Sequence, residues 1–167
     1  MIAYQAADIK SFFTRELSSF SQIGNLVMII VDPYFGGRNS YLRENVEEFL
    51  DYISTLAGNI RFVWFSNEYK CPPMSHSYVD NFDLSSHGIE VHDRFFLLFD
   101  GTVKKYMYHF HLGGSINGID WNGTDSLSLM RVSVLAQDEI KELEVLVQKL
   151  ESVYSHQTGK SNWGCLS

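Results

Sequence analysis

Cysteine is scarce in this chain of 167 residues, which contains only Cys71 and Cys165. The two are far apart and neither belongs to a C-x-x-C pair, so neither a structural zinc site nor a disulfide framework is indicated. This use of cysteine is typical of a reducing compartment. We therefore expect a cytoplasmic protein without a metal or other cofactor.

Long apolar runs are missing as well. The first residues, MIAYQAADIKSFFTREL, lack the basic start and continuous apolar stretch of a signal peptide, and no window approaches the roughly 18 apolar residues of a membrane-spanning helix. We expect an uncleaved protein that forms no stable association with a membrane.

Positive charge is in deficit, with 13 Lys and Arg against 20 Asp and Glu, a net charge of -7. This balance opposes non-specific binding of nucleic acid, although a local basic patch can override it. There are only three prolines, and 45% of the residues are hydrophobic, a composition typical of an ordered globular chain. The length fits a single domain covering residues 1–167.

A βαβ unit is predicted in the first half of the chain. The run NLVMIIVD ends in Asp32 and suits a strand covered on both faces, and NIRFVWFS forms a second such run. Between them, residues 41–56 place apolar side chains every three or four positions, as in an amphipathic helix. This order predicts two parallel strands and an α/β fold with a mixed sheet flanked by helices.

The remaining elements follow from the same patterns. Residues 6–20 predict a helix, residues 67–87 a long loop, and residues 88–99 and 103–112 a hairpin. LSLMRVSVL predicts another strand. Residues 137–154 predict a helix whose apolar spacing suits either core packing or a dimer contact. The polar tail HQTGKSNWGCLS is expected to be frayed.

Candidate chemistry gathers around the predicted hairpin. In a strand, residues two apart point to one face, so His92 and Arg94 should project together, and Ser115 and Asn117 share a face if GGSING is extended. Arg can grip phosphate oxygens, Ser and Asn can donate hydrogen bonds to them, and His can attack phosphorus. The four residues suit a phosphate site that needs no metal.

With these residues the sequence resembles the phospholipase D superfamily, whose signature is His-x-Lys, an apolar strand ending in Asp, and Gly-Ser-x-Asn. The matching residues are His92, Arg94, the strand 95–99 and the segment 114–117. The likeness is closest to a bacterial group with His-Asp-Arg, and IIVDPYF extends it over most of the chain. Arg94 stands where the family has Lys, and Asp100 lies one position beyond the family's Asp.

The resemblance implies a phospholipase D-like fold and a metal-independent phosphodiesterase. In the family mechanism His92 attacks phosphorus to give a phosphohistidine, a second His protonates the leaving group, and water releases the product. Since this chain holds one motif copy, the resemblance implies a homodimer with facing His92 residues. It also implies nucleic acid as the substrate and a role in bacterial defence.

Other residues allow alternatives. Asp100 forms half of an Asp-Gly turn, so a structural role is the stronger interpretation and it is left out of the catalytic set. His111 is expected to line the phosphate pocket, although a His109 and His111 pair could also bind a metal with Asp120. Further candidate substrate contacts lie near strand ends, at Tyr34, Phe35 and Trp121.

Two functions therefore compete. The first is a homodimeric nuclease that uses His92, Arg94, Ser115 and Asn117. The alternative is an inactive phospholipase D-like dimer that binds a protein partner or a phosphorylated ligand, which the substitution at Arg94 and the displaced Asp100 favour. A lipid phosphodiesterase ranks last, because the sequence has no amphipathic basic segment or hydrophobic anchor.

Overall fold

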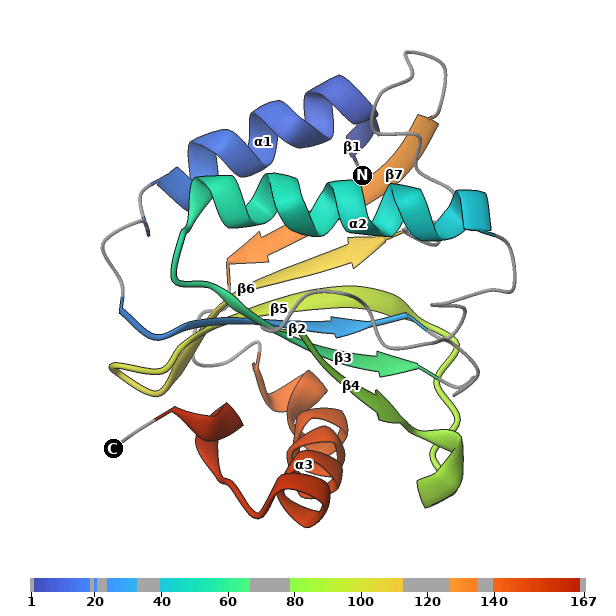
Figure 1. Ribbon diagram of the computed structural model, residues 1–167, viewed down its shortest axis with the longest axis vertical. Helices are drawn as coiled ribbons and strands as arrows, with labels where there is room; N and C mark the ends of the chain where they lie inside the picture. The colour runs from blue at the N-terminus through green and yellow to red at the C-terminus, as the bar shows by residue number, and fades with distance from the viewer. Residues whose placement is uncertain are drawn as a thin grey trace.

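The computed structural model describes residues 2–18, 20, 24–32, 40–66, 79–112, 127–134 and 140–165. Its centre is a seven-stranded mixed sheet with helices on both faces (Figure 1), which confirms the predicted α/β class with a mixed sheet flanked by helices. The strand order is β1-β7-β6-β5-β2-β3-β4. The strands are β1 (Ile2–Gln5), β2 (Leu26–Val31), β3 (Arg61–Ser66), β4 (Val79–Asp83), β5 (Arg94–Asp100), β6 (Lys105–Leu112) and β7 (Leu127–Val134).

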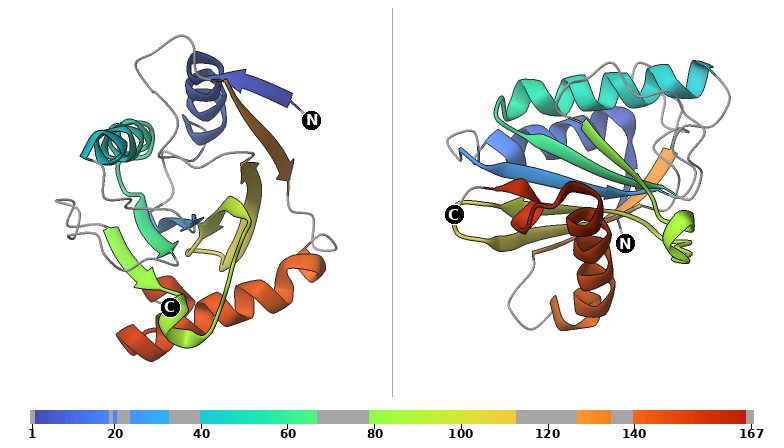
Figure 2. Two further views of the ribbon diagram at one scale, coloured as in Figure 1. Left: turned by 90° about the vertical axis from the view of Figure 1, so that its right-hand side faces the viewer. Right: turned by 60° about the horizontal axis from the view of Figure 1, so that its bottom comes forward.

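The predicted βαβ unit is confirmed. Strands β2 and β3 are parallel, with Val27 opposite Arg61, and helix α2 (Ser40–Leu56) connects them across one face. All six residues of β2 are buried, as expected for a strand covered on both faces. Helix α1 (Ala6–Ser18) lies on the same face as α2, whereas α3 (Ile140–Thr158) covers the opposite face (Figures 1 and 2).

The expected long loop at 67–87 is wrong for its last part, which contains β4, paired with β3 in parallel, while residues 67–78 lie outside the described residues. A 3₁₀ turn, η1 (Ser85–His87), follows β4. The hairpin of β5 and β6 is confirmed as an antiparallel pair, but β5 begins at Arg94 and not at Gly88. Gly88 adopts a left-handed conformation with φ of 66° that ends η1, so the chain is still turning there.

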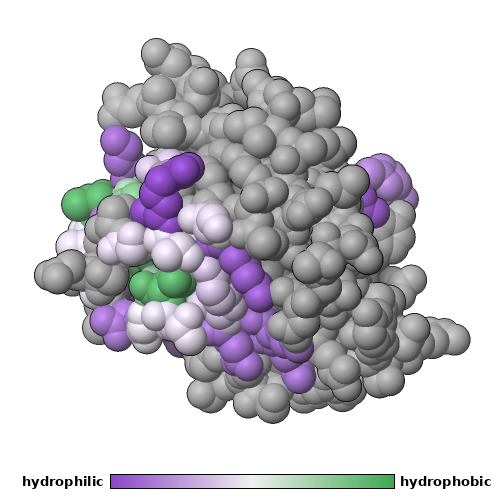
Figure 3. All heavy atoms as spheres, turned by 90° about the horizontal axis from the view of Figure 1, so that it is seen from above, coloured by the Kyte–Doolittle hydropathy of each residue, from purple (hydrophilic) through white to green (hydrophobic). Residues whose placement is uncertain are grey.

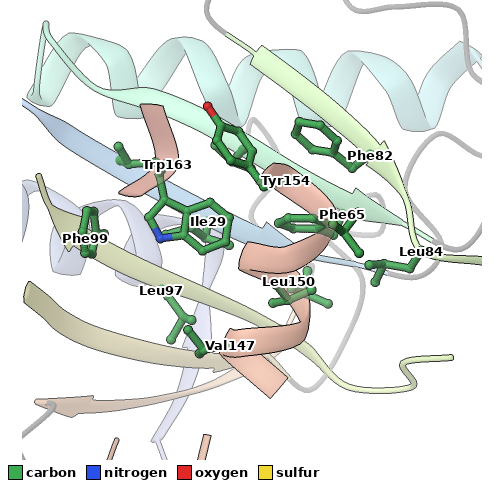
Figure 4. Packing of buried hydrophobic residues seen from close by; sticks show 14 of the residues in the cluster. Ile29, Phe65, Phe82, Leu84, Leu97, Phe99, Val147, Leu150, Tyr154 and Trp163 are labelled. Atoms are coloured by element: carbon green, nitrogen blue, oxygen red, sulfur yellow. The ribbon is translucent and has the colours of Figure 1, made fainter. Parts of the chain in front are cut away.

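Two hydrophobic clusters lie on either side of the sheet. The cluster under α1 and α2 includes Phe13, Phe49 and Phe96, which contact one another through their rings. The cluster under α3 includes Val147, Leu150 and Tyr154, which point toward strand residues such as Phe65 and Leu97 (Figure 4). Of the two uses that the spacing of this helix allows, core packing is the one observed for these three residues.

The expected fraying of the C-terminal tail is wrong for the part that the structure describes. A 3₁₀ turn, η3 (Asn162–Gly164), folds back onto the α3 side, where Trp163 is 1% exposed. Its indole Nε1 donates to the Tyr106 hydroxyl at 2.9 Å, and the Arg61 guanidinium donates to its carbonyl. One buried aromatic residue thus fixes a segment whose average composition is polar.

Within the described residues, no helix has the length and apolar character needed to cross a membrane. Figure 3 shows the molecule from the top side of the view in Figure 1. The coloured part of this surface is mostly hydrophilic or neutral, with small green hydrophobic areas.

Candidate functional site

A buried ion pair joins the start of β5 to the end of β2. Val31 lies opposite Phe95 in the antiparallel ladder, which places Asp32 beside Arg94. Arg94 Nε lies 3.9 Å from Asp32 Oδ1, and the Asp32 side chain is fully buried while that of Arg94 is 25% exposed. A carboxylate buried to this degree requires a compensating cation. Arg94 supplies that charge and still reaches the surface.

Ser66 extends this arrangement onto β3. Val31 and Phe65 are neighbours in the parallel ladder, and the Asp32 amide donates to the Phe65 carbonyl at 3.0 Å. Alternation then puts Ser66 on the same face as Asp32, the face covered by α1 and α2. We refer to Arg94, Asp32 and Ser66 together as the polar row.

Asp83, on β4, lies opposite Ser66 in the parallel ladder. Its carboxylate, however, accepts hydrogen bonds from the turn that follows β4. Its Oδ1 accepts hydrogen bonds from the Ser85 amide, at 3.0 Å, and from the Ser85 hydroxyl. The polar row therefore ends at Ser66.

The position of the polar row is that of a ligand site in many α/β folds. It lies at the carboxyl ends of the parallel strands β2 and β3, where open sheets bind ligands. Helix α2 begins at the same edge of the sheet (Figure 1). A part-exposed guanidinium at this edge of the sheet is suited to an anion.

His92 is not part of the polar row in the described structure. It precedes β5 outside the strand, so the alternation that pairs it with Arg94 does not apply. Its side chain is 79% exposed, and its Nε2 lies 3.6 Å from the Glu90 carboxylate, which is itself 78% exposed. A pair this exposed contributes little energy and leaves His92 accessible from solvent.

His111 lies on the other face of the sheet from Arg94. Phe95 is opposite His111 in the ladder, and directly opposed residues project to the same side. Phe95 belongs to the cluster under α3, and its ring lies 5.5 Å from that of His109. Within one chain, the expectation that His111 lines a pocket with Arg94 is therefore wrong.

Asp100 has the structural role that its Asp-Gly turn favours. It is 7% exposed, and its Oδ1 accepts a hydrogen bond from the Thr102 amide at 2.8 Å. This bond stabilises the turn between β5 and β6.

The other candidates lie outside the described residues. These are the expected catalytic residues Ser115 and Asn117, the expected substrate contacts Tyr34, Phe35 and Trp121, and the alternative metal ligand Asp120. In the part of the chain that the structure describes, no group of three or more His, Cys, Asp and Glu side chains is placed to hold a metal ion. The His109 and His111 rings are 6.4 Å apart.

Sequence reasoning noted Asp32 only as the end of an apolar run, and it did not single out Ser66. The available signal was that each run, NLVMIIVD and NIRFVWFS, ends in a polar residue at the carboxyl end of a buried strand. Two such endings on adjacent parallel strands meet at one edge of a sheet.

Comparison with known proteins identifies no relative, because no family model, curated protein or solved structure matches the chain.

Proposed function

We propose that the chain is a phospholipase D-like protein that binds the phosphate group of its ligand at Arg94. The observation that carries this proposal is the ion pair between buried Asp32 and part-exposed Arg94, at the sheet edge where α2 begins. The buried Asp32 carboxylate attracts the guanidinium to this edge of the sheet, and the guanidinium fork suits phosphate oxygens. The likeness of HDRFFLL and GGSIN to the family signature supports the same assignment.

Ligand binding without turnover is the function that this geometry supports best. Arg94 is anchored, whereas His92 contacts only Glu90 among the interactions identified for it in the described structure. The bound molecule is a phosphorylated ligand, and a nucleic acid must overcome the net charge of -7.

Metal-independent cleavage by a homodimer is the second candidate, and the exposure of His92 favours it. A side chain that is 79% exposed can reach a substrate and a second copy of the chain. Two facing His92 residues would then act as nucleophile and acid, and Ser115 and Asn117 would donate hydrogen bonds to the phosphate.

The experiment measures binding and cleavage together. Fluorescently labelled single-stranded DNA and RNA report affinity, and a chromogenic phosphodiester with EDTA reports hydrolysis. Arg94→Gln should weaken binding about tenfold or more, because a charge-assisted pair is lost. Lys149→Gln, which removes an exposed α3 cation, is the matched control and should change affinity less than twofold.

His92→Ala separates the two candidates. Loss of cleavage with binding retained supports the nuclease, and a mass measurement must then show a dimer. Binding without cleavage in the native protein supports the inactive module. If no probe binds, or if Arg94→Gln behaves like Lys149→Gln, the phosphate-site proposal is wrong.

A further inference from the structure

Two histidines from distant parts of the chain lie side by side at the surface. His87 belongs to the turn η1 and His156 to the last turn of α3, and their ring centroids lie 5.7 Å apart with an interplanar angle of 82°. Gln157 completes the group, because its side-chain amide lies 2.7 Å from His87 Nε2. We refer to His87, His156 and Gln157 together as the histidine cluster. None of the three belongs to the polar row.

The backbone beneath both rings is held in place. The amides of His87 and Ile89 donate to the carbonyl of fully buried Leu84, at 3.0 Å and 3.1 Å. On α3, Tyr154 lies two residues before His156 and is packed into the core. The two histidine side chains themselves remain at least partly exposed. Fixed backbone therefore keeps two imidazoles close together, while their exposed rings can turn about their side-chain torsions.

Such a pair suits a transition-metal ion. Imidazole nitrogen is a favoured ligand of Zn²⁺, Cu²⁺ and Ni²⁺, and it binds zinc at about 2.0–2.1 Å. Two imidazoles that share one tetrahedral zinc ion have ring centroids roughly 5 Å apart. The observed separation of 5.7 Å is within reach of ring rotation. The net charge of -7 also attracts cations to the chain.

We propose that the histidine cluster binds a divalent transition-metal ion such as Zn²⁺, with His87 and His156 as nitrogen ligands. The two ends of an amide side chain have the same shape, so the Gln157 carbonyl oxygen can turn toward the ion as a third ligand. In the described part of the chain no third His, Cys, Asp or Glu joins the pair, so water completes the coordination. The ion links η1 to α3. This inference goes beyond the proposed function and does not depend on it.

Calorimetric titration of the intact, untagged chain with ZnCl₂ tests the proposal. One ion should bind, and ZnCl₂ should raise the melting temperature, because the unfolded chain separates the two ligands. His87→Gln and His156→Gln should each weaken Zn²⁺ binding about tenfold or more, since one imidazole alone loses the advantage of two ligands held on one scaffold. MgCl₂ is the control ion and should bind far more weakly, because Mg²⁺ prefers oxygen ligands.

His111→Gln is the matched control variant. It removes one imidazole from the other histidine pair, His109 and His111 on β6, whose rings lie 6.4 Å apart. It should change Zn²⁺ affinity less than about twofold, because neither residue is a ligand of the proposed site. Gln157→Glu should tighten Zn²⁺ binding, since a carboxylate is a stronger zinc ligand than an amide oxygen.

Three results would overturn the proposal. The first is a native chain that binds no Zn²⁺ or binds Mg²⁺ equally well, as expected if its acidic surface merely attracts divalent ions. The second is loss of binding in His111→Gln while His87→Gln and His156→Gln retain it, which would place the ion on β6. The third is unchanged or weaker binding by Gln157→Glu. None of these results bears on the phosphate site, because Arg94 is not a metal ligand.

Discussion

Two polar side chains on opposite faces of the sheet, Tyr106 under α3 and Ser66 under α1 and α2, differ in how they are paired. Under α3, the Tyr106 hydroxyl donates to Glu151 at 2.5 Å and accepts from the Trp163 indole at 2.9 Å. Under α1 and α2, Asp32 faces Arg94 at 3.9 Å, and Ser66 has no partner in the described structure. A paired network stabilises a fold, whereas a buried hydroxyl without a partner does not.

The largest effect is expected on the paired side. Trp163→Ala should lower the free energy of unfolding by about 3–5 kcal/mol, because it leaves a cavity and removes a partner of Tyr106. Its ring also lies 5.4 Å from Tyr154 and 6.0 Å from Phe65. Urea unfolding measures the change, and Val103→Ala at the exposed hairpin tip is the control. A cost below 1 kcal/mol would show that the tail is not held as described.

A smaller loss is expected for Tyr106→Phe. The Glu151 carboxylate and the Trp163 indole each lose a partner while the ring remains, which costs about 1–3 kcal/mol. The same urea experiment applies. A neutral result would mean that water replaces the hydroxyl at no cost and that the network is not a source of stability.

The same residue predicts a pH dependence. Burial, and then the hydrogen bond and charge of Glu151, raise the pKa of Tyr106 well above its ordinary value of 10.0. The protonated phenol is thus favoured in the folded state, so its contribution is complete below pH 10 and is lost as the pH rises further. The native chain should lose stability above that pH more steeply than Tyr106→Phe. Parallel curves would contradict the assignment.

The smallest effect on stability is expected in the polar row. Ser66→Ala should change the free energy of unfolding by less than about 0.5 kcal/mol, or increase it, because its hydroxyl has no hydrogen-bond partner in the described structure. Thermal unfolding of the ligand-free chain measures this change. A loss comparable to that of Tyr106→Phe would remove the contrast between the two faces.

Local sequence patterns predicted most elements but missed two edge strands and the turn η3. The spacing of apolar residues every three or four positions located α2, continuous apolar runs located β2 and β3, and strand patterns on either side of a turn located the hairpin of β5 and β6. The missed strands, β1 and β4, are the short outer members of the sheet, with 4 and 5 residues. Short edge strands are specified by the neighbour they pair with, so their sequences carry little signal.

The candidate site was predicted in part. His92 and Arg94 were chosen as a pair on one strand face, but the strand begins at Arg94, and boundaries are the weakest element of such predictions. His111 was expected to line the phosphate pocket, although the ladder puts it opposite Phe95, on the other face of the sheet from Arg94. The register of a strand pair is the set of residues that face each other. The sequence of one strand alone does not specify it.

The sequence by itself determined the α/β class of the fold and singled out Arg94 as the cation of the proposed site. The buried runs and the helix between them require a parallel pair, and Arg94 follows from its place before an apolar strand. Only the tertiary structure decided which residues accompany Arg94. Asp32 and Ser66 join it because three strands from distant parts of the chain align in register on one face, and such long-range pairing is set by packing of the whole sheet.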